Sequence, residues 1–412
     1  MKRIGILGAG ISGLSMGKIL QQSRRYQVEI LERESEIGGI AKTRSIDGAT
    51  YHPIGGHCFN SKHQEVLDFV FSILPLEHWH KVERNANIHF EGMDIPYPIE
   101  YSIKEIHKQD PELAATLALD FLEVVDTGQY ANLEDWFVQK FGKSLAERYF
   151  IPYNRKIWNK EPKDMSYEWV ADKLPIPNKR GFIESLINEK KDQMPHSVFY
   201  YPNTNNQNSL IEALADGLPI IKDHEIKSIR YDAANQQWQI NEGERSYDTL
   251  ISTLPLNILP SLIAGTPEEV LGHAKKLKFN KVTTMFWSTK GTERTWSYFP
   301  NPDTLFHRQI HIGNFFEPKQ PFTITEAVGE RSHEEMMEAG RMDPFLDQAL
   351  GYNVSNHAYV VFDEHTTTSK RAILDHLHSI GLHSLGRFGE WEYYNMDICI
   401  RQALLLFKRL DA

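Results

Sequence analysis

The spacing of hydrophobic and polar residues changes near residue 80 and again near residue 200. Before the first change, short apolar runs at 3–7 and 27–31 predict buried strands, and a glycine-rich turn follows the first of them. Between residues 103 and 149 the apolar positions recur at helical spacing. This order predicts an α/β chain with a helical insertion. The two expected helix faces are Leu113, Leu117, Phe121 and Leu122, and Leu133, Trp136, Phe137 and Phe141.

Further strands are expected in two sheets outside the N-terminal region. Segments 86–90 and 94–97 flank a turn at Gly92 and predict a hairpin. Segments 281–288 and 304–312 predict strands of a separate sheet, which 359–362 joins.

The segments after residue 218 are expected to complete the domain that begins with the strands at 3–7 and 27–31. Segments 226–231 and 238–240 predict a second hairpin, and 247–253 predicts a strand that ends before Leu254-Pro255. The polar stretch 178–195 is expected to be a mobile surface segment.

The turn after the first strand carries a glycine fingerprint, Gly8-Ala9-Gly10-Ile11-Ser12-Gly13. In such a turn Gly8 bends the chain, Gly10 lets the backbone approach a pyrophosphate, and Gly13 allows the helix to pack closely on the strand. Glu32 follows Gly8 by 24 positions, near the roughly 20 residues at which a carboxylate accepts hydrogen bonds from a ribose diol. These residues predict a dinucleotide site, and Glu32 disfavours the 2′-phosphate of NADP. The alternative is an ordinary strand-to-helix turn.

A second glycine pair, Gly38-Gly39, precedes Ile40 and Thr43. It resembles the diglycine extension of the FAD-binding oxidase superfamily, which supports the same pyrophosphate. This extension changes the expected cofactor from NAD to FAD.

Composition restricts the class of protein. At 412 residues the chain exceeds the roughly 250–300 residues of a single core, so two or three domains are expected. A net charge of −10 argues against a nucleic-acid partner. Two cysteines without metal-ligand spacing predict a reducing compartment and no metal site. No apolar run approaches the roughly 20 residues of a membrane span, and no signal peptide is seen, so a cytoplasmic protein without membrane contact is expected.

The expected architecture is a Rossmann-like FAD-binding domain of the GR2 flavoprotein type with an inserted helical domain and a separate antiparallel β-sheet domain. The FAD-binding domain is discontinuous, and the helical region is expected to cover the substrate. The expected boundaries are 1–80, 200–265 and 370–412 for the FAD-binding domain, 100–195 for the helical domain, and 81–99 with 266–369 for the β-sheet domain.

Three further segments carry a family resemblance. They are Gly55-Gly56-His57-Cys58-Phe59, the stretch 153–158 from Tyr153 to Trp158, and 386–397, which begins with Gly386-Arg387. With the glycine fingerprint they are dispersed over nearly the whole chain, and together they resemble the UDP-galactopyranose mutase family. The Tyr-to-Trp spacing followed by Leu174-Pro175 is the more specific feature, because amine oxidases, desaturases and protoporphyrinogen oxidases share the glycine fingerprint and the C-terminal Gly-Arg.

The resemblance implies a role for each matching residue. The expected cofactor-binding residues are Gly8, Gly10, Ser12, Gly13, Glu32, Arg33, Gly39, Ile40, Gly56, His57, Gly386, Arg387 and Met396. The expected substrate-binding residues are Tyr153, Trp158, Lys173, Arg308, Tyr359, Tyr393 and Asn395. Among these, His57, Arg308 and Lys173 are the expected catalytic residues. His57 would orient the flavin, and the turn at 386–387 and the helix from Met396 would present backbone N–H groups to its carbonyl edge.

Each of these residues also has an ordinary interpretation. Without the resemblance, His57 would be a surface histidine in a turn, Tyr153 and Trp158 core residues, and Arg308 an exposed ion-pair partner. The chain also departs from the family pattern. Lys173 stands where the family has its other diphosphate arginine, Asn395 replaces an aspartate, and Asn60 stands where many bacterial members have a second histidine. A lysine offers a point charge rather than a planar fork, so these departures leave the sugar open.

The resemblance implies a redox-neutral mutase that interconverts the pyranose and furanose forms of a UDP-sugar for cell-surface glycan synthesis. In the family, N5 of reduced FAD attacks the anomeric carbon and forms a flavin–sugar adduct, so reduced FAD is the active cofactor and NAD(P)H is a candidate external reductant. A homodimer is one assembly considered. The alternatives are an FAD-dependent oxidase or desaturase and a non-catalytic flavin-binding relative.

Overall fold

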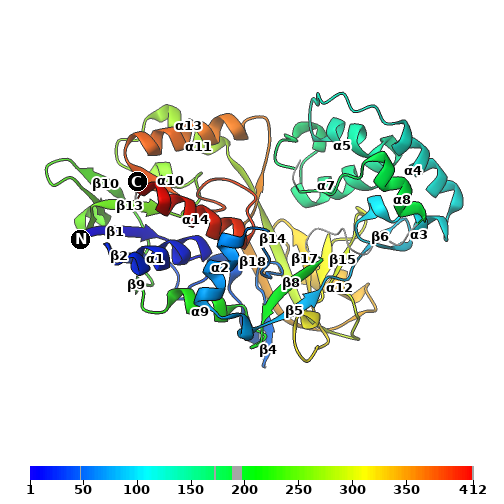
Figure 1. The fold of residues 1–412 in the computed structure, drawn as a ribbon, viewed down its shortest axis with the longest axis horizontal. Helices are drawn as coiled ribbons and strands as arrows, with labels where there is room; N and C mark the ends of the chain where they lie inside the picture. The colour runs from blue at the N-terminus through cyan, green and yellow to red at the C-terminus, as the bar shows by residue number, and fades with distance from the viewer. Residues whose placement is uncertain (47, 171–172, 188–196, 411–412) are drawn as a thin grey trace.

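The computed structural model describes residues 1–46, 48–170, 173–187 and 197–410. Figure 1 shows a nucleotide-type domain at the left, which holds both chain termini, and a β-sheet at the lower right with a group of helices above it. The nucleotide-type domain and the β-sheet are each formed by several separate stretches of the chain, whereas the helices above the sheet lie between residues 103 and 187. This arrangement is the mixed α/β architecture expected from the sequence.

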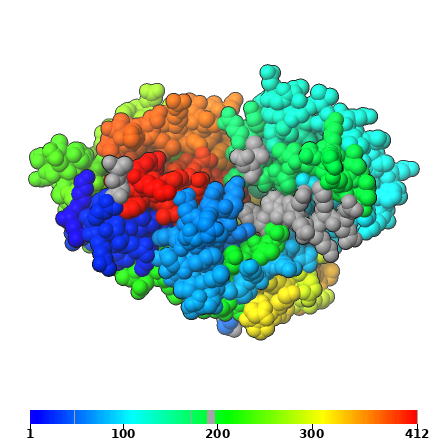
Figure 2. All heavy atoms as spheres, viewed as in Figure 1, coloured from blue at the N-terminus to red at the C-terminus, as the bar shows by residue number. Residues whose placement is uncertain are grey.

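A five-stranded parallel sheet forms the centre of the nucleotide-type domain. Its order is β19-β13-β1-β2-β9, and Ile6 of β1 lies between Ile30 of β2 and Ile251 of β13. All three side chains are buried, as the apolar runs predict. Helix α1 follows β1 directly, and the C-terminal helix α14 packs beside it, as the red and blue residues in Figure 2 show. The elements are β1 Lys2–Leu7, α1 Ile11–Ser23, β2 Tyr26–Leu31, β9 Ile220–Ile221, β13 Thr249–Ser252, β19 Leu382–Ser384 and α14 Met396–Leu410.

A seven-stranded sheet forms the second domain, with the order β18-β14-β17-β16-β15-β6-β7. The predicted hairpin is confirmed as β6 and β7, and it joins this sheet through a parallel pairing between β6 and β15. The other neighbouring strands are antiparallel. Strands from early and late parts of the sequence therefore complete one sheet. They are β6 Ala86–Phe90, β7 Met93–Pro96, β14 Lys278–Thr289, β15 Trp296–Tyr298, β16 Arg308–Ile310, β17 Phe322–Val328 and β18 Leu346–Val361.

The helical region lies above this sheet in Figure 1. Its two long helices bury the expected apolar faces, with Leu117 and Trp136 each 1% exposed. Asp110 and Asn132 accept hydrogen bonds from first-turn N–H groups, and these caps fix where the helices begin. The helices are α3 Ile103–His107, α4 Pro111–Glu123, α5 Leu133–Phe141, α6 Lys143–Leu145, α7 Ile151–Trp158 and α8 Lys179–Ile187.

Smaller elements connect the domains. Strands β5 and β8 pair as a two-stranded ribbon, and β10 and β11 form the second predicted hairpin. The remaining elements are β3 Arg44–Ile46, β4 Ala49–Tyr51, α2 Gln64–Ile73, β5 Trp79–Glu83, β8 Val198–Pro202, α9 Asn208–Ala215, β10 Ile229–Asp232, β11 Gln237–Ile240, β12 Arg245–Tyr247, α10 Leu259–Leu262, α11 Glu268–Lys276, α12 His333–Arg341 and α13 Thr366–Ser379.

Three expected segments differ in the structure. The strand expected at 247–253 is divided at Asp248, whose carboxylate accepts from the Arg3 and Gln237 N–H groups, so β12 and β13 enter different sheets. Only Arg308–Ile310 of 304–312 is a strand. Within 178–195, Lys179–Ile187 is helix α8 with Phe182 buried, which corrects the expected mobile segment there, and 188–195 lie outside the described residues.

Over the described ranges, no helix combines the length and apolarity that a membrane crossing requires.

Candidate functional site

A cavity of 570 Å³ lies where the nucleotide-type domain meets the seven-stranded sheet. It begins at the carboxyl ends of β1 and β2, which is where parallel α/β sheets bind ligands, and continues to β15 and β16. Its walls therefore come from both domains. Among the expected residues, those that line it are Gly8, Gly10, Ser12, Glu32, Arg33, Gly39, Ile40, Gly56, His57, Arg308, Gly386, Arg387, Asn395 and Met396.

The three fingerprint glycines have different surroundings. A Cβ atom on Gly8, whose φ is +101°, would lie 2.3 Å from the Thr253 hydroxyl oxygen. A Cβ on Gly13 would lie 2.0 Å from the Gly8 carbonyl oxygen, so Gly13 serves the packing of α1 on β1 and does not line the cavity. At Gly10 the nearest atom would be the Gly39 Cα at 3.8 Å. Gly10 is therefore open toward the cavity, as a backbone that approaches a pyrophosphate must be.

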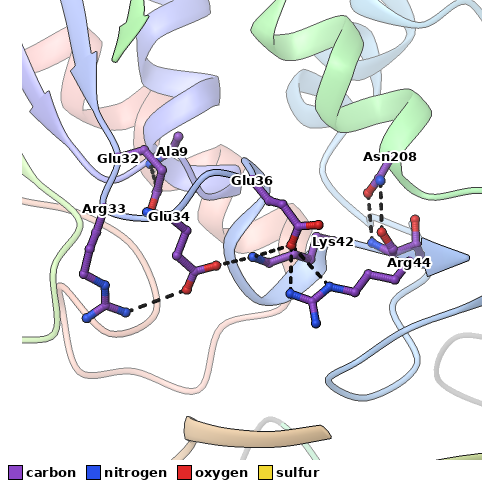
Figure 3. Close-up of polar contacts among 9 residues, drawn as sticks. Ala9, Glu32, Arg33, Glu34, Glu36, Lys42, Arg44 and Asn208 are labelled. Carbon is purple, nitrogen blue, oxygen red and sulfur yellow. Dashed lines mark hydrogen bonds and ion pairs between the residues drawn. The ribbon is translucent and has the colours of Figure 1, made fainter. Parts of the chain in front are cut away.

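Glu32 is held at the end of β2 by two backbone N–H groups (Figure 3). Ala9 donates to one carboxylate oxygen at 2.7 Å and Glu34 donates to the other at 2.9 Å. These contacts fix the carboxylate beside the glycine turn, where it lines the cavity. Arg33 also lines the cavity and is 68% exposed, with Glu34 at 3.7 Å.

The second glycine pair lies directly against the first. The Gly38 N–H donates to the Ala9 carbonyl at 2.8 Å, and a Cβ on Gly39 would lie 3.1 Å from the Gly10 Cα. Gly39 has a φ of +56°, which a residue with a side chain adopts rarely. The two glycine segments therefore form one wall around the same part of the cavity.

The C-terminal turn closes this wall from the other side. Gly386 has a φ of +91°, and a Cβ there would lie 2.2 Å from the Ser12 hydroxyl oxygen. The Gly386 N–H donates to the Glu390 carboxyl group at 2.9 Å. Because this N–H group is already paired with Glu390, Gly386 does not present it to the cavity, contrary to the expectation from the sequence. The first turn of α14, from Met396, still faces the cavity.

His57 is a half-buried residue of the cavity wall, and its imidazole is neutral near pH 7. Burial and the charge of Arg387 lower its pKa to about 4. Its backbone N–H lies 3.4 Å from Nδ1 of His52, whose other ring nitrogen pairs with the Tyr201 hydroxyl at 2.8 Å. Nε2 of His57 has no hydrogen-bond partner within the described part of the chain. A ligand group in the cavity can supply that partner.

Arg308 is paired with a buried carboxylate. The register of β16 and β17 places it opposite Glu326, and its Nε donates to that side chain. Burial opposes ionisation of Glu326, but the charge of Arg308 and the contact with His307 overcome it and hold the pKa of Glu326 at about 2. Arg308 also donates to the Tyr359 hydroxyl at 2.8 Å and remains 22% exposed. It can therefore meet an anion, although Glu326 shares its charge.

The expected aromatic residues form a packed group beside the cavity rather than in its wall. The ring centroids of Trp158, Tyr359 and Tyr393 lie 5.8 to 6.0 Å apart. Arg387 connects this group to the cavity, with its guanidinium 4.6 Å from the Tyr393 ring centre. Nζ of Lys173 lies 4.9 Å from the same ring centre and donates to the Tyr393 carbonyl.

Tyr153 joins the cavity through a neighbour. Its ring lies 6.0 Å from that of Tyr298, and Tyr298 lines the cavity. The substrate-binding roles of Tyr153 and of the packed aromatic group remain predictions.

Sequence reasoning missed several residues of the cavity wall. Arg84, Trp296 and Tyr298 line it, as do Cys58 and Phe199. Arg84, Phe199, Trp296 and Tyr298 belong to no quoted motif, and only the folded sheets bring them together, whereas Cys58 lies in the segment 55–59 but was given no role. Among the described residues, no group of three or more His, Cys, Asp or Glu side chains is arranged to hold a metal ion.

Comparisons with known proteins agree with this geometry. Residues 6–72 match the model of the NAD(P)-binding Rossmann-like domain. A UDP-galactopyranose mutase of Mycoplasma genitalium is 24% identical over 224 residues, which cover 52% of this chain and 51% of that protein. The alignment thus spans about half of the relative's length.

A solved structure of reduced UDP-galactopyranose mutase superposes with a TM-score of 0.88 at 22% identity, and covers 100% of this chain and 94% of that one. The resemblance to the UDP-galactopyranose mutases is confirmed. A putative protoporphyrinogen oxidase from Exiguobacterium superposes with a TM-score of 0.76 at 16% identity, covering 99% and 98% of the two chains. The mutase is therefore the nearer of these two structures, and both share the fold.

Proposed function

We propose that the protein is an FAD-dependent mutase that interconverts the pyranose and furanose forms of a UDP-sugar. The proposal rests on the position of three guanidinium groups, those of Arg84, Arg308 and Arg387, in one cavity. The same cavity is lined by the two glycine segments 8–13 and 38–40, which together are called the glycine cradle. An amine, lipid or tetrapyrrole oxidase needs an apolar substrate site, whereas a nucleotide diphosphate needs cations.

The cavity fits the dinucleotide part of FAD. The open face of Gly10 and the N-terminus of α1 would receive its pyrophosphate, and Glu32 would receive a ribose diol. His57 would offer its unpaired Nε2 to the flavin, and α14 would direct its first N–H groups and its positive helix end at the ring. When bound and reduced, FAD supplies a nucleophile for the anomeric carbon of the sugar.

The protein's own residues would bind and orient the substrate. Arg308 would hold the diphosphate with one edge of its guanidinium while Glu326 fixes the other edge. The ammonium group of Lys173 lies over Tyr393 and would add a point charge there. Trp158, Tyr359 and Tyr393 lie beside these cations, so a uracil or sugar face would insert among them. This insertion requires the packed group to open.

The finer parts of the function remain proposals. They are the requirement for reduced FAD, NAD(P)H as the reductant, a cytoplasmic place of action and a role in cell-surface glycan synthesis.

The deciding experiment is an anaerobic incubation of dithionite-reduced, FAD-loaded protein with UDP-galactopyranose, with separation of products by chromatography. We expect a ring-contracted UDP-sugar in the reduced sample and none in an oxidised control. No conversion by the reduced protein would contradict the proposal for this sugar. Bleaching of the oxidised flavin by an amine or lipid would favour the oxidase alternative.

A further inference from the structure

Arg84 lies just past the end of β5 and lines the cavity together with Trp296 and Tyr298 of the seven-stranded sheet. Its Nη2 donates to the Tyr298 hydroxyl at 2.7 Å. Its guanidinium is stacked with two rings, 4.7 Å from the Tyr97 ring centre and 5.1 Å from that of Trp296. The side chain is thus held rigidly, and it lines the cavity.

Among the described residues, no aspartate or glutamate forms an ion pair with Arg84, and its buried Nε has no hydrogen-bond partner. Burial disfavours its charged form, but the nearby Tyr298 and Tyr97 hydroxyls outweigh this effect and raise the pKa of Arg84. Within the described residues, Arg84 is therefore a permanent cation whose neighbours are aromatic rings, hydroxyl groups and the Cys58 thiol.

Arg308 differs in this respect. Glu326 pairs with Arg308 and is only 1% exposed, so the two charges nearly cancel before any ligand arrives. A cation without a counter-ion in a partly desolvated wall is unfavourable, because the charge has lost part of its hydration. An anionic ligand would relieve that cost at Arg84 more than at Arg308.

We propose that Arg84 binds the diphosphate of a nucleotide at the β-sheet end of the cavity and determines its affinity. This inference rests on the proposed function, because it places a second nucleotide beyond the cofactor cradle. Beside the Nη2 contact with Tyr298, the guanidinium of Arg84 would offer its remaining N–H groups to phosphate oxygens as a planar fork, which Lys173 cannot provide. A nucleotide sugar and NAD(P)H both carry a diphosphate, so both are candidate ligands.

The test compares Arg84→Met with Lys81→Met in FAD-loaded protein. Met keeps the length and loses the charge in both variants, and Lys81 is an exposed residue of β5 that does not line the cavity. UDP and NADPH are titrated separately by calorimetry, with flavin content and thermal midpoint recorded to verify folding. We expect Arg84→Met to weaken binding in at least one titration by roughly 10- to 100-fold, Arg84→Lys to weaken it less, and Lys81→Met to bind like the wild type.

The two titrations separate the two sources of the diphosphate. A loss of affinity for UDP in Arg84→Met assigns the site to the nucleotide sugar. A loss of affinity for NADPH alone assigns it to the reductant. Unchanged affinities for both ligands in a folded, FAD-loaded Arg84→Met protein would overturn the inference while the proposed function stands. If the wild type, fully loaded with FAD, binds neither ligand, the proposed function fails together with the inference.

Discussion

The three fingerprint glycines show how one residue type meets three different constraints. Gly8 needs a positive φ, Gly13 has the Gly8 carbonyl against it, and Gly10 has free space that a ligand would use. Substitutions at Gly10 and Gly13 therefore affect different properties of the protein.

We predict that Gly10→Val loses FAD but stays folded, with about 1 kcal/mol lost from the free energy of unfolding. Gly13→Ala should instead lose at least about 3 kcal/mol, because its Cβ would overlap a backbone oxygen. Flavin absorbance of the purified proteins and their denaturant midpoints measure the two effects. A fully flavin-loaded Gly10→Val protein would contradict the proposal that the Gly10 backbone lies against the pyrophosphate.

Arg308 is the residue that would hold the diphosphate of the substrate. Arg308→Ala should weaken UDP binding by roughly 10- to 100-fold and leave flavin content unchanged, because a charge-assisted contact to phosphate is lost. The change also leaves Glu326 without its partner, so the double variant Arg308→Ala/Glu326→Gln serves as the control. Wild-type UDP affinity in both variants would remove Arg308 from the diphosphate site.

The sequence could identify residues that occur in motifs and missed those that do not. Gly8, Gly10 and Glu32 were predictable because their spacing reflects one local turn. Arg84 and Tyr298 were not, because their proximity depends on the parallel pairing of β6 with β15, which joins segments about two hundred positions apart.

At the scale of elements, the pairing of β16 with β17 determines the electrostatics of the cavity. Glu326 faces Arg308 across the two strands and is also 3.4 Å from His307, so one carboxylate serves two partners. A shift of one residue in this register would turn Glu326 to the opposite face of the sheet.

We predict that Glu326→Gln lowers the free energy of unfolding by about 3–5 kcal/mol near pH 7, because it leaves a buried arginine unpaired. The folded pKa of Glu326, about 2, lies below its ordinary value of 4.5, so its contribution is present above pH 4.5 and is lost as the pH falls toward 2. Denaturant titrations of both proteins across this range measure the difference. A gap that persists at pH 2 would show that packing, not charge, is responsible.

Glu390, in the turn that begins at Gly386, makes the free energy of unfolding depend on pH in the direction opposite to Glu326. Burial raises the pKa of Glu390 to about 7 from 4.5, so the folded protein keeps a proton that the unfolded chain has released. The stabilisation from this proton is complete below pH 4.5 and is lost as the pH rises through 7.

We therefore predict that the wild type loses about 2–3 kcal/mol relative to Glu390→Gln between pH 4.5 and 8. Gln keeps an acceptor for the Gly386 N–H and does not titrate. Thermal or denaturant midpoints of both proteins across the pH range measure this difference. Parallel profiles for the two proteins would contradict the predicted contribution of Glu390.

Elements were predictable where a local pattern determined them. The helical faces of α4 and α5 and both hairpins followed from periodicity and turn residues. The division of 247–253 did not, because Asp248 breaks the strand through contacts with Arg3 and Gln237, which no local pattern contains.

At the scale of the whole molecule, the cavity is assembled from distant parts of the chain. The cradle uses residues 8–13 and 38–40, the histidine turn lies near residue 57, and the last wall comes from residues 385–399. The fold class was predictable because each part has its own pattern. The relative placement of the parts was not, because it depends on packing between domains.

We predict that a chain ending at residue 380 binds no FAD. It lacks β19, the turn at Gly386 and α14, which leaves α1 without the helix that packs beside it. Exposed apolar surface on α1 should also make the product aggregate. Flavin content and size-exclusion profiles of the truncated and intact proteins, prepared in parallel with added FAD, measure both effects; a soluble, yellow truncated protein would contradict this account.

The closure of the cavity by α14 also limits when a cofactor can be captured during synthesis. A ribosome makes the glycine turn before the residues that enclose it, because β13, β19 and α14 all follow that turn in the sequence. The central sheet of the nascent chain therefore stays incomplete until β19 has been made. Capture of a dinucleotide is expected to follow the synthesis of α14, so a flavin-loaded molecule would be one in which this helix has been made and has docked.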